Sequence, residues 1–244
     1  MRSGNPALTS KTFEGFGAYS EKMTLEGTVN KTALLLAVVV IAASWTWGRA
    51  FQATNAAELT PYILVGAIGG FIVAMITIFA KQYSAYTAPL YAVLEGLALG
   101  ALSALFEMKY PGIVLQAVGL TFGTLFCLLG AYKSGLIKPT ENFKLGIVAA
   151  TGAIALLYLI DIALGFFLGQ PIPFIHEGGL FGILFSVFVV VIAALNLVLD
   201  FDFIENGVEN GSPKYMEWYG AFGLLVTLVW LYLEILRLLA KSRE

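Results

Sequence analysis

Charged residues are scarce in this sequence: Asp, Glu, Lys and Arg make up 12% of its 244 residues. In soluble domains about a quarter of the residues are charged, so little of the protein surface is expected to face water. The formal net charge of −2 offers no basic face, which argues against a nucleic-acid partner. The only cysteine, Cys127, cannot form an internal disulfide, so the redox compartment cannot be read from it.

The residue patterns of common catalytic sites are also missing. His176 is the only histidine, which excludes a histidine-based metal cluster, and its proline-rich surroundings indicate a surface residue. No G-x-S-x-G motif occurs, and Ser186 has no base near it in the sequence. Phosphate-binding loops and dinucleotide fingerprints are absent. The sequence therefore predicts a protein that is not an enzyme, with no catalytic residue and no cofactor.

Apolar residues, in contrast, make up 59% of the sequence, and its mean hydropathy is +0.83. A helix crosses the hydrocarbon core of a bilayer with about 20 apolar residues. Barrel strands would alternate in polarity over about ten residues, whereas these apolar runs are continuous. We therefore predict an all-α membrane protein, a bundle of seven transmembrane helices near residues 32–51, 61–80, 88–106, 113–132, 145–168, 180–202 and 218–240.

The polar segment 1–31 precedes these spans, and residues 32–244 are predicted to form a single transmembrane domain. With a cytoplasmic N-terminus, the inner segments hold nine Lys and Arg residues and the outer segments five. Cytoplasmic segments are the richer in Lys and Arg, so segment 1–31 is predicted to be cytoplasmic. We expect a multi-pass protein of the cell membrane whose principal partner is the lipid bilayer.

Pairs of glycines four residues apart occur in several spans. Such pairs let helix backbones approach closely, which matters in lipid because hydrophobic burial does not drive helices together. Tight helix packing is therefore predicted at Gly66/Gly70, Gly96/Gly100, Gly119/Gly123 and Gly165/Gly169.

Acidic residues interrupt or end the apolar runs. Ionisable groups near the bilayer centre each cost about 2.5–3.5 kcal/mol or more, so they are candidates for function. We expect functional carboxylates among Glu95, Asp161, Asp200, Asp202 and Glu234.

Each position also has a structural interpretation. Asp202 and Glu205 lie at the end of a span, where water can solvate them. Glu234 is three residues before Arg237, on the same helix face, so the two side chains can form a local ion pair. Asp161 can serve as a hydrogen-bonding group between helices. Glu95 and Asp200 have no opposite charge nearby in the sequence.

The last two spans resemble the transmembrane Bax inhibitor-1 family. The resemblance is carried by Asn196–Asp200 (NLVLD) and Leu231–Glu234 (LYLE), and Met1–Leu8 (MRSGNPAL) is similar to a prokaryotic branch. It implies six helices around a central seventh, and a pH-sensitive calcium leak gated by two aspartates. Asp200 matches the first aspartate, and Glu234 stands in place of the second. Lys81 matches a basic latch residue.

This resemblance implies a calcium-permeable leak channel of a prokaryotic inner membrane. Its closed state would be held by a proton shared between Asp200 and Glu234, the two residues that could also bind calcium. Glu95, Asp161 and Asp202 would be candidates for the ion path. Two alternatives stay open: a non-conducting protein that binds a membrane protease or a stress-pathway partner, and a proton-coupled transporter.

Hydropathy conflicts with this pairing in one respect. It places Asp200 near the inner end of its span and Glu234 sixteen residues into the last one, a difference of roughly 25 Å along the helix axis. The two carboxylates can meet only if these helices begin or end beyond their apolar stretches.

Overall fold

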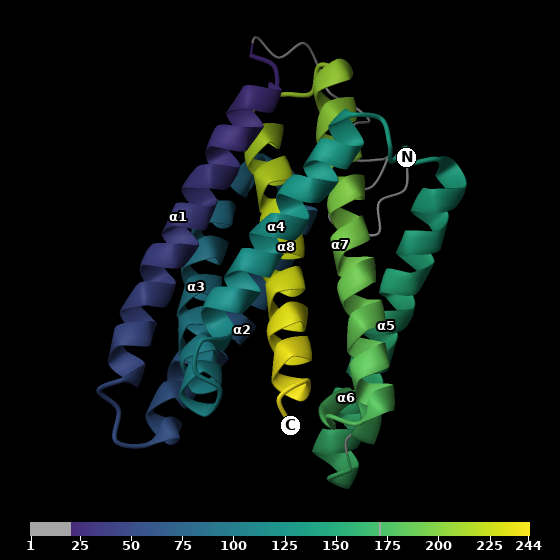
Figure 1. The fold of residues 1–244 in the computed structure, drawn as a ribbon. Helices are drawn as coiled ribbons and strands as arrows, with labels where there is room; N and C mark the ends of the chain where they lie inside the picture. Colours follow the sequence, from purple (N-terminus) through teal and green to yellow (C-terminus); the bar gives the residue numbers. More distant parts are fainter. Residues whose placement is uncertain (1–20, 171) are drawn as a thin grey trace. The chain divides into compact units, whose positions relative to one another are not determined.

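The computed structural model of the chain describes residues 21–170 and 172–244 (Figure 1). The predicted segment 1–31 is therefore described from residue 21 onward, and Met1–Leu8 lies outside the described residues. The long helices are α1 (Leu25–Ala50), α2 (Thr60–Phe79), α3 (Ser84–Lys109), α4 (Ile113–Lys133), α5 (Glu141–Leu168), α7 (Leu180–Glu209) and α8 (Met216–Lys241). Short elements are the 3-10 turns η2 (Ala56–Leu59) and η3 (Lys81–Tyr83) and the single-turn helix α6 (Pro173–His176).

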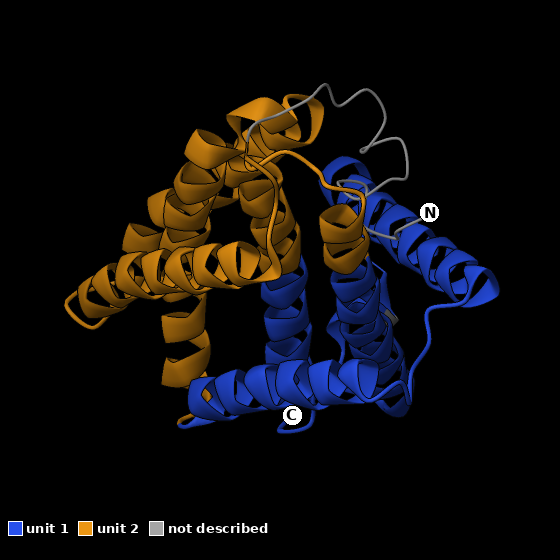
Figure 2. Cartoon of the chain, turned by 90° about the horizontal axis from the view of Figure 1, so that it is seen from above, with its two compact units in different colours: residues 1–10, 112–202, 227–244 blue, residues 11–111, 203–226 orange. Residues whose placement is uncertain are grey.

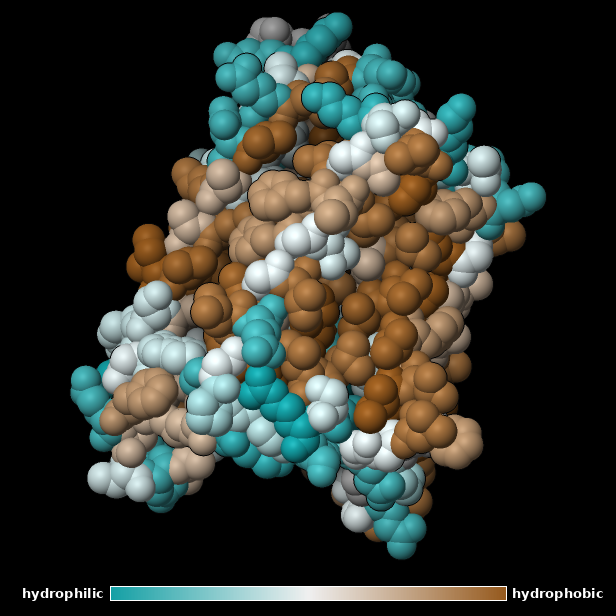
Figure 3. All heavy atoms as spheres, viewed as in Figure 1, coloured by the Kyte–Doolittle hydropathy of each residue, from teal (hydrophilic) through white to brown (hydrophobic). Residues whose placement is uncertain are grey.

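Within these residues, seven helices are long and apolar enough to cross a membrane, as the sequence predicts. The shortest, α2, has 20 residues, which corresponds to about 30 Å, the thickness of the hydrocarbon core. Large apolar side chains lie on the outside of α5, among them Leu159 (64% exposed) and Phe166 (81% exposed). Figure 3 shows one face on which apolar side chains cover a large part of the surface. Such surfaces are stable in lipid and unfavourable in water.

Two helices extend well beyond their apolar stretches. Helix α1 begins at Leu25, seven residues before the predicted span, because the Thr24 side chain accepts a hydrogen bond from the Gly27 N–H and caps the helix. Helix α7 continues from residue 202 to Glu209. The connection to α8 is therefore the short turn 210–215, and not the whole stretch 203–217 that lies between the two predicted spans. Capping and backbone hydrogen bonds set helix ends, whereas hydropathy reports only the part in lipid.

The chain divides into two compact units (Figure 2). Among the described residues, unit 2 comprises residues 21–111 and 203–226, which hold α1, α2, α3, the end of α7 and the beginning of α8. Unit 1 comprises residues 112–170, 172–202 and 227–244, with α4, α5, α6 and the remaining parts of α7 and α8. The two last helices thus each contribute to both units. The prediction that the last helix is central stays a prediction.

Close helix packing in unit 2 occurs at the predicted glycines. A Cβ at Gly96 would lie 2.6 Å from the carbonyl oxygen of Val39, and a Cβ at Gly100 would overlap that of Ala43. On α2, a Cβ at Gly66 would lie 2.5 Å from the carbonyl oxygen of Leu94. These glycines let α3 touch the backbones of α1 and α2, which confirms two of the four predicted packing motifs.

Gly119, Gly123 and Gly169 do not pack in this way. A Cβ at Gly119 or at Gly123 would meet no atom of the described residues within 4 Å. Gly169 has a positive φ of 65° and ends α5 as a C-terminal cap, a conformation that glycine adopts without strain. The prediction of tight packing is therefore wrong for Gly119/Gly123 and for Gly169. Spacing alone does not say which face of a helix a neighbour covers.

Candidate functional site: carboxylates inside the helix bundle

Four carboxylates are buried in the described structure: Asp161, Asp200, Glu217 and Glu234 are between 0% and 6% exposed. Removing a charged group from water is expensive unless donors or cations compensate it. The partners of each carboxylate therefore decide what it can do.

Glu234 of α8 is held by two residues of unit 1. The Tyr158 hydroxyl of α5 donates to Glu234 Oε1 at 3.0 Å. Arg237 Nη1 donates to the two Glu234 oxygens at 3.1 and 3.2 Å, and to the Tyr158 hydroxyl oxygen at 2.9 Å. The guanidinium carbon of Arg237 also lies 5.3 Å from the centre of the Tyr158 ring. The predicted local ion pair between Glu234 and Arg237 is confirmed. Tyr158 was not predicted, because a tyrosine in an apolar run has no distinguishing sequence signal.

Asp200 of α7 is completely buried. It lies nine residues before Glu209, the end of α7, whereas Glu234 lies eighteen residues after Met216, the start of α8. For two helices that run in opposite directions from turn 210–215, this difference corresponds to about 13 Å along the axis. The offset is smaller than hydropathy suggested, because α7 continues beyond residue 202 to Glu209 and so places Asp200 further from the turn. Direct proton sharing between Asp200 and Glu234 stays a prediction.

The position of Asp202 at the end of a span suggested a side chain solvated by water, but the structure gives it a protein partner. Its Oδ2 lies 2.8 Å from Nζ of Lys144 on α5, and the side chains are only 17% and 8% exposed. The ammonium group of Lys144 also lies 3.4 Å from the exposed carboxylate of Glu141. Asp202 therefore links α7 to the beginning of α5 within unit 1. Glu205, one turn further along α7, is exposed as expected.

Asp161 accepts hydrogen bonds from the segment that follows α5. The Ile172 N–H lies 2.7 Å from Asp161 Oδ1, and His176 Nε2 lies 2.8 Å from Oδ2. The interpretation of His176 as an ordinary surface residue is therefore incomplete: its side chain is 54% exposed but pairs with a buried carboxylate. These contacts hold the α5–α7 connection, whereas a role of Asp161 in an ion path stays a prediction.

Glu95 and Lys81 lie in unit 2. Glu95 is hydrogen-bonded to Tyr91 one turn earlier on α3, and a Cβ on Gly70 of α2 would lie 2.9 Å from its Oε1. Nζ of Lys81 lies 5.9 Å from the ring centre of Tyr219 on α8. Asp200 belongs to the other unit, so the predicted latch role of Lys81 stays a prediction.

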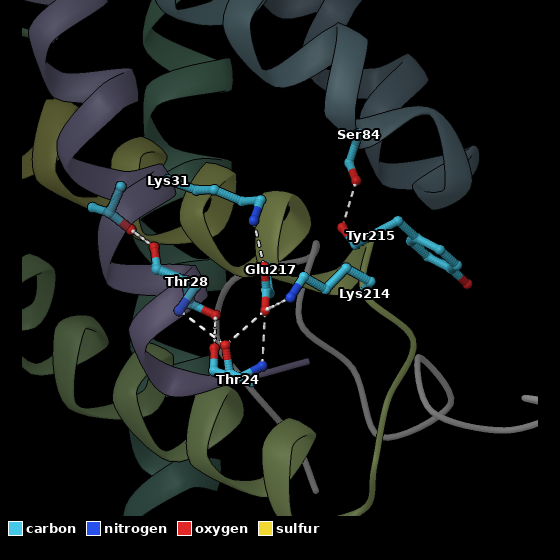
Figure 4. A network of polar contacts seen from close by, with 9 residues as sticks. Thr24, Thr28, Lys31, Ser84, Lys214, Tyr215 and Glu217 are labelled. Carbon is cyan, nitrogen blue, oxygen red and sulfur yellow. Dashed lines mark hydrogen bonds and ion pairs between the residues drawn. The ribbon is translucent and has the colours of Figure 1, made fainter. Parts of the chain in front are cut away.

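Glu217 was missed by the sequence analysis. It lies in the first turn of α8 and is completely buried in unit 2 (Figure 4). It accepts hydrogen bonds from the Thr24 N–H at 2.9 Å and the Thr24 hydroxyl at 2.8 Å, and it forms an ion pair with Lys31. Lys214 Nζ lies 3.5 Å from Oε1. A carboxylate just before an apolar stretch is normally interpreted as a solvated side chain at a helix end. The sequence therefore had no signal for the burial of Glu217.

Ser186 has a basic partner that its sequence neighbourhood did not reveal. Nζ of Lys241 donates to Ser186 Oγ at 3.0 Å and to the carbonyl oxygen of Gly182 at 3.1 Å. Both side chains are buried. As a hydrogen-bond donor in both contacts, the Lys241 amine ties the end of α8 to α7. Among the described residues, no group of three or more His, Cys, Asp or Glu side chains is placed to hold a metal ion.

Seven apolar helices with carboxylates buried among them define a multi-pass α-helical membrane protein. A family model described as Bax inhibitor 1 like matches residues 5–244. The chain belongs to this family, as the motifs of its last two spans indicated. Comparison with curated proteins gave no match, and comparison with solved structures gave none either.

Proposed function

We propose that the protein forms a calcium-permeable leak path whose opening depends on the protonation of Asp200 and Glu234. The observation that carries this proposal is the buried carboxylate of Glu234, bound between Tyr158 of α5 and Arg237 of α8. Carboxylates are hard oxygen ligands and match Ca²⁺ better than softer metals. A buried carboxylate inside a membrane bundle is also the kind of group that marks ion pathways.

The Glu234 cluster, which consists of Glu234, Tyr158 and Arg237, also supports the proposed dependence of opening on pH. An ionised Glu234 accepts from Tyr158 and Arg237 and so links α5 to α8. Protonation removes its attraction for the guanidinium group and leaves a weaker, neutral hydrogen bond. The population with α5 and α8 separated should then grow, so the flux is expected to rise as the pH falls. Asp200 would act at another level of the path, about 13 Å away along the helix axis.

Calcium flux into liposomes that contain a calcium-sensitive dye tests both parts of the proposal. The wild-type protein should conduct, and Glu234→Gln and Asp200→Asn should each flatten the dependence of flux on pH. Glu205→Gln is a matched control, since Glu205 is exposed on the same helix as Asp200. A wild-type protein without flux contradicts the leak and leaves a non-conducting or transporting role. An unchanged pH profile in both variants contradicts the gating.

We further propose that the protein lies in the cell membrane of a prokaryote with its N-terminus in the cytoplasm. The excess of Lys and Arg on the N-terminal side supports this orientation. Reporter tags at the two ends should show a cytoplasmic N-terminus and an external C-terminus. The opposite pattern contradicts the orientation.

A further inference from the structure

The segment before α1 is attached to the α7–α8 turn by backbone hydrogen bonds. The Met23 N–H donates to the carbonyl oxygen of Ser212 at 2.7 Å, and the Lys214 N–H donates to that of Glu21 at 3.1 Å. Lys22 and Pro213 form an isolated antiparallel bridge between the two segments. All of these residues belong to unit 2. Glu21–Thr24, Ser212–Lys214 and Glu217 together are called the N-terminal clasp below.

Glu217 is the centre of this clasp (Figure 4). The titratable and charged groups that face its carboxylate are Lys31 on α1 and Lys214 before α8, and Thr24 supplies a backbone and a hydroxyl donor. The carboxylate also lies at the N-terminal ends of both α1 and α8, where helix dipoles favour negative charge. Every one of these contacts therefore stabilises the ionised form.

The surrounding residues leave space for this carboxylate and little else. A Cβ on Gly27, in the first turn of α1, would overlap the carboxylate oxygens of Glu217. Nζ of Lys31 lies 5.5 Å from the ring centre of Trp218, the next residue of α8. A further hydrogen bond, from the Ser84 hydroxyl to the carbonyl oxygen of Tyr215 at 3.0 Å, attaches the start of α3 to the same turn. The first turn of α8 is thus fixed from several sides.

We propose that Glu217 is a positioning residue of the gate, which is formed by the Asp200 and Glu234 carboxylates whose protonation is proposed to open the path. Through the N-terminal clasp it holds the beginning of α8, the helix that carries Glu234, and release of Glu21–Thr24 frees α8 to move and opens the path. The opening step rests on the proposed function; the restraint on α8 does not. The clasp gives the chain before α1 a mechanical connection to the gate that does not pass through the Glu234 cluster.

Two pairs of variants test the clasp in the full-length protein. Gly27→Ala displaces the Glu217 carboxylate without removing its charge, and Gly48→Ala is its control, because a Cβ at Gly48 of the same helix meets no atom within 4 Å. Glu217→Gln removes the charge, and Glu26→Gln is its control, because Glu26 is exposed in the first turn of α1.

Hydrogen exchange in lipid nanodiscs measures whether the N-terminal clasp restrains the beginning of α8. Backbone amides of residues 21–24 and of the first turns of α8 should exchange about tenfold faster or more in Gly27→Ala and Glu217→Gln, with no change in the controls. Unchanged exchange in α8 overturns the clasp as a restraint, whether or not the protein conducts.

Calcium flux then measures whether loosening the N-terminal clasp opens the path. In both clasp variants the flux at neutral pH should increase several-fold relative to the controls. Loss of folded protein would lower the flux, so an increase is not explained by destabilisation alone. If the wild type conducts and the clasp variants do not exceed it, the positioning role is overturned. If the wild type does not conduct, the proposed function fails, and the exchange of α8 still decides the clasp.

Discussion

The hydroxyl of Tyr158 lies 3.0 Å from Oε1 of Glu234 and 2.9 Å from Nη1 of Arg237. The hydroxyl donates to the carboxylate and accepts from the guanidinium group, so it completes a closed set of contacts among three residues, and two of these contacts join α5 to α8. A buried network in which all members are bonded is stabilising, whereas a partly bonded one is costly. The stability of unit 1 should therefore respond to each member differently.

Tyr158→Phe should destabilise the protein by about 1–3 kcal/mol, because it leaves Glu234 with one donor fewer in a buried site. Thermal unfolding in detergent micelles measures the change. Tyr86→Phe is the control, since Tyr86 is 79% exposed. Equal melting temperatures for the two variants would mean that the Tyr158 hydroxyl adds nothing to the contact between α5 and α8.

Arg237→Met should also destabilise the protein, because the 3% exposed side chain of Glu234 loses its cation. Adding Glu234→Gln to Arg237→Met should recover part of the loss, since the amide carries no charge to compensate. The partly exposed Arg237 side chain moderates both effects. A double variant less stable than Arg237→Met would contradict a net electrostatic role of the pair. The four proteins of this cycle are compared by thermal unfolding.

The two carboxylates that face Lys144 should differ in importance. Asp202→Asn removes the negative charge from a 2.8 Å contact between two largely buried side chains, whereas Glu141→Gln removes it from a 3.4 Å contact made by a side chain that is 73% exposed. Asp202→Asn is expected to lower stability by about 1 kcal/mol or more, and Glu141→Gln by at most a few tenths. Chemical denaturation of the two variants gives the comparison. A larger effect at Glu141 would contradict the linking role of Asp202.

Gly100→Ala and Gly123→Ala should change stability in opposite directions. At Gly100 the added methyl group overlaps the backbone of Ala43, so α1 and α3 must separate, which is expected to destabilise by about 1–3 kcal/mol. At Gly123 the methyl group meets no atom within 4 Å, and the better helix propensity of alanine should stabilise by up to about 1 kcal/mol. Thermal unfolding compares the two variants directly. Equal effects would show that α1 and α3 are not in backbone contact at Gly100.

The amino-acid sequence by itself determined the seven spans, the α-helical class and the acidic residues inside the spans. It could do so because each segment in lipid must satisfy its own backbone hydrogen bonds, so the signal is local. The ion pair of Glu234 with Arg237 was predictable for the same reason, since the two residues are three positions apart on one helix. The family also followed from short motifs in the last two spans.

Only the tertiary structure decided which residue each carboxylate contacts. Tyr158 and Glu234 are 76 positions apart, and Thr24 and Glu217 are 193 positions apart. Hydropathy does not fix the rotation of a helix or the position of its ends along the axis. For the same reason the sequence could not distinguish Gly100, which touches a neighbouring backbone, from Gly123, where a Cβ would meet no atom of the described residues within 4 Å. The burial of Glu217 likewise depends on Thr24 and Lys31 from the opposite end of the chain, which become its neighbours only after the helices have packed.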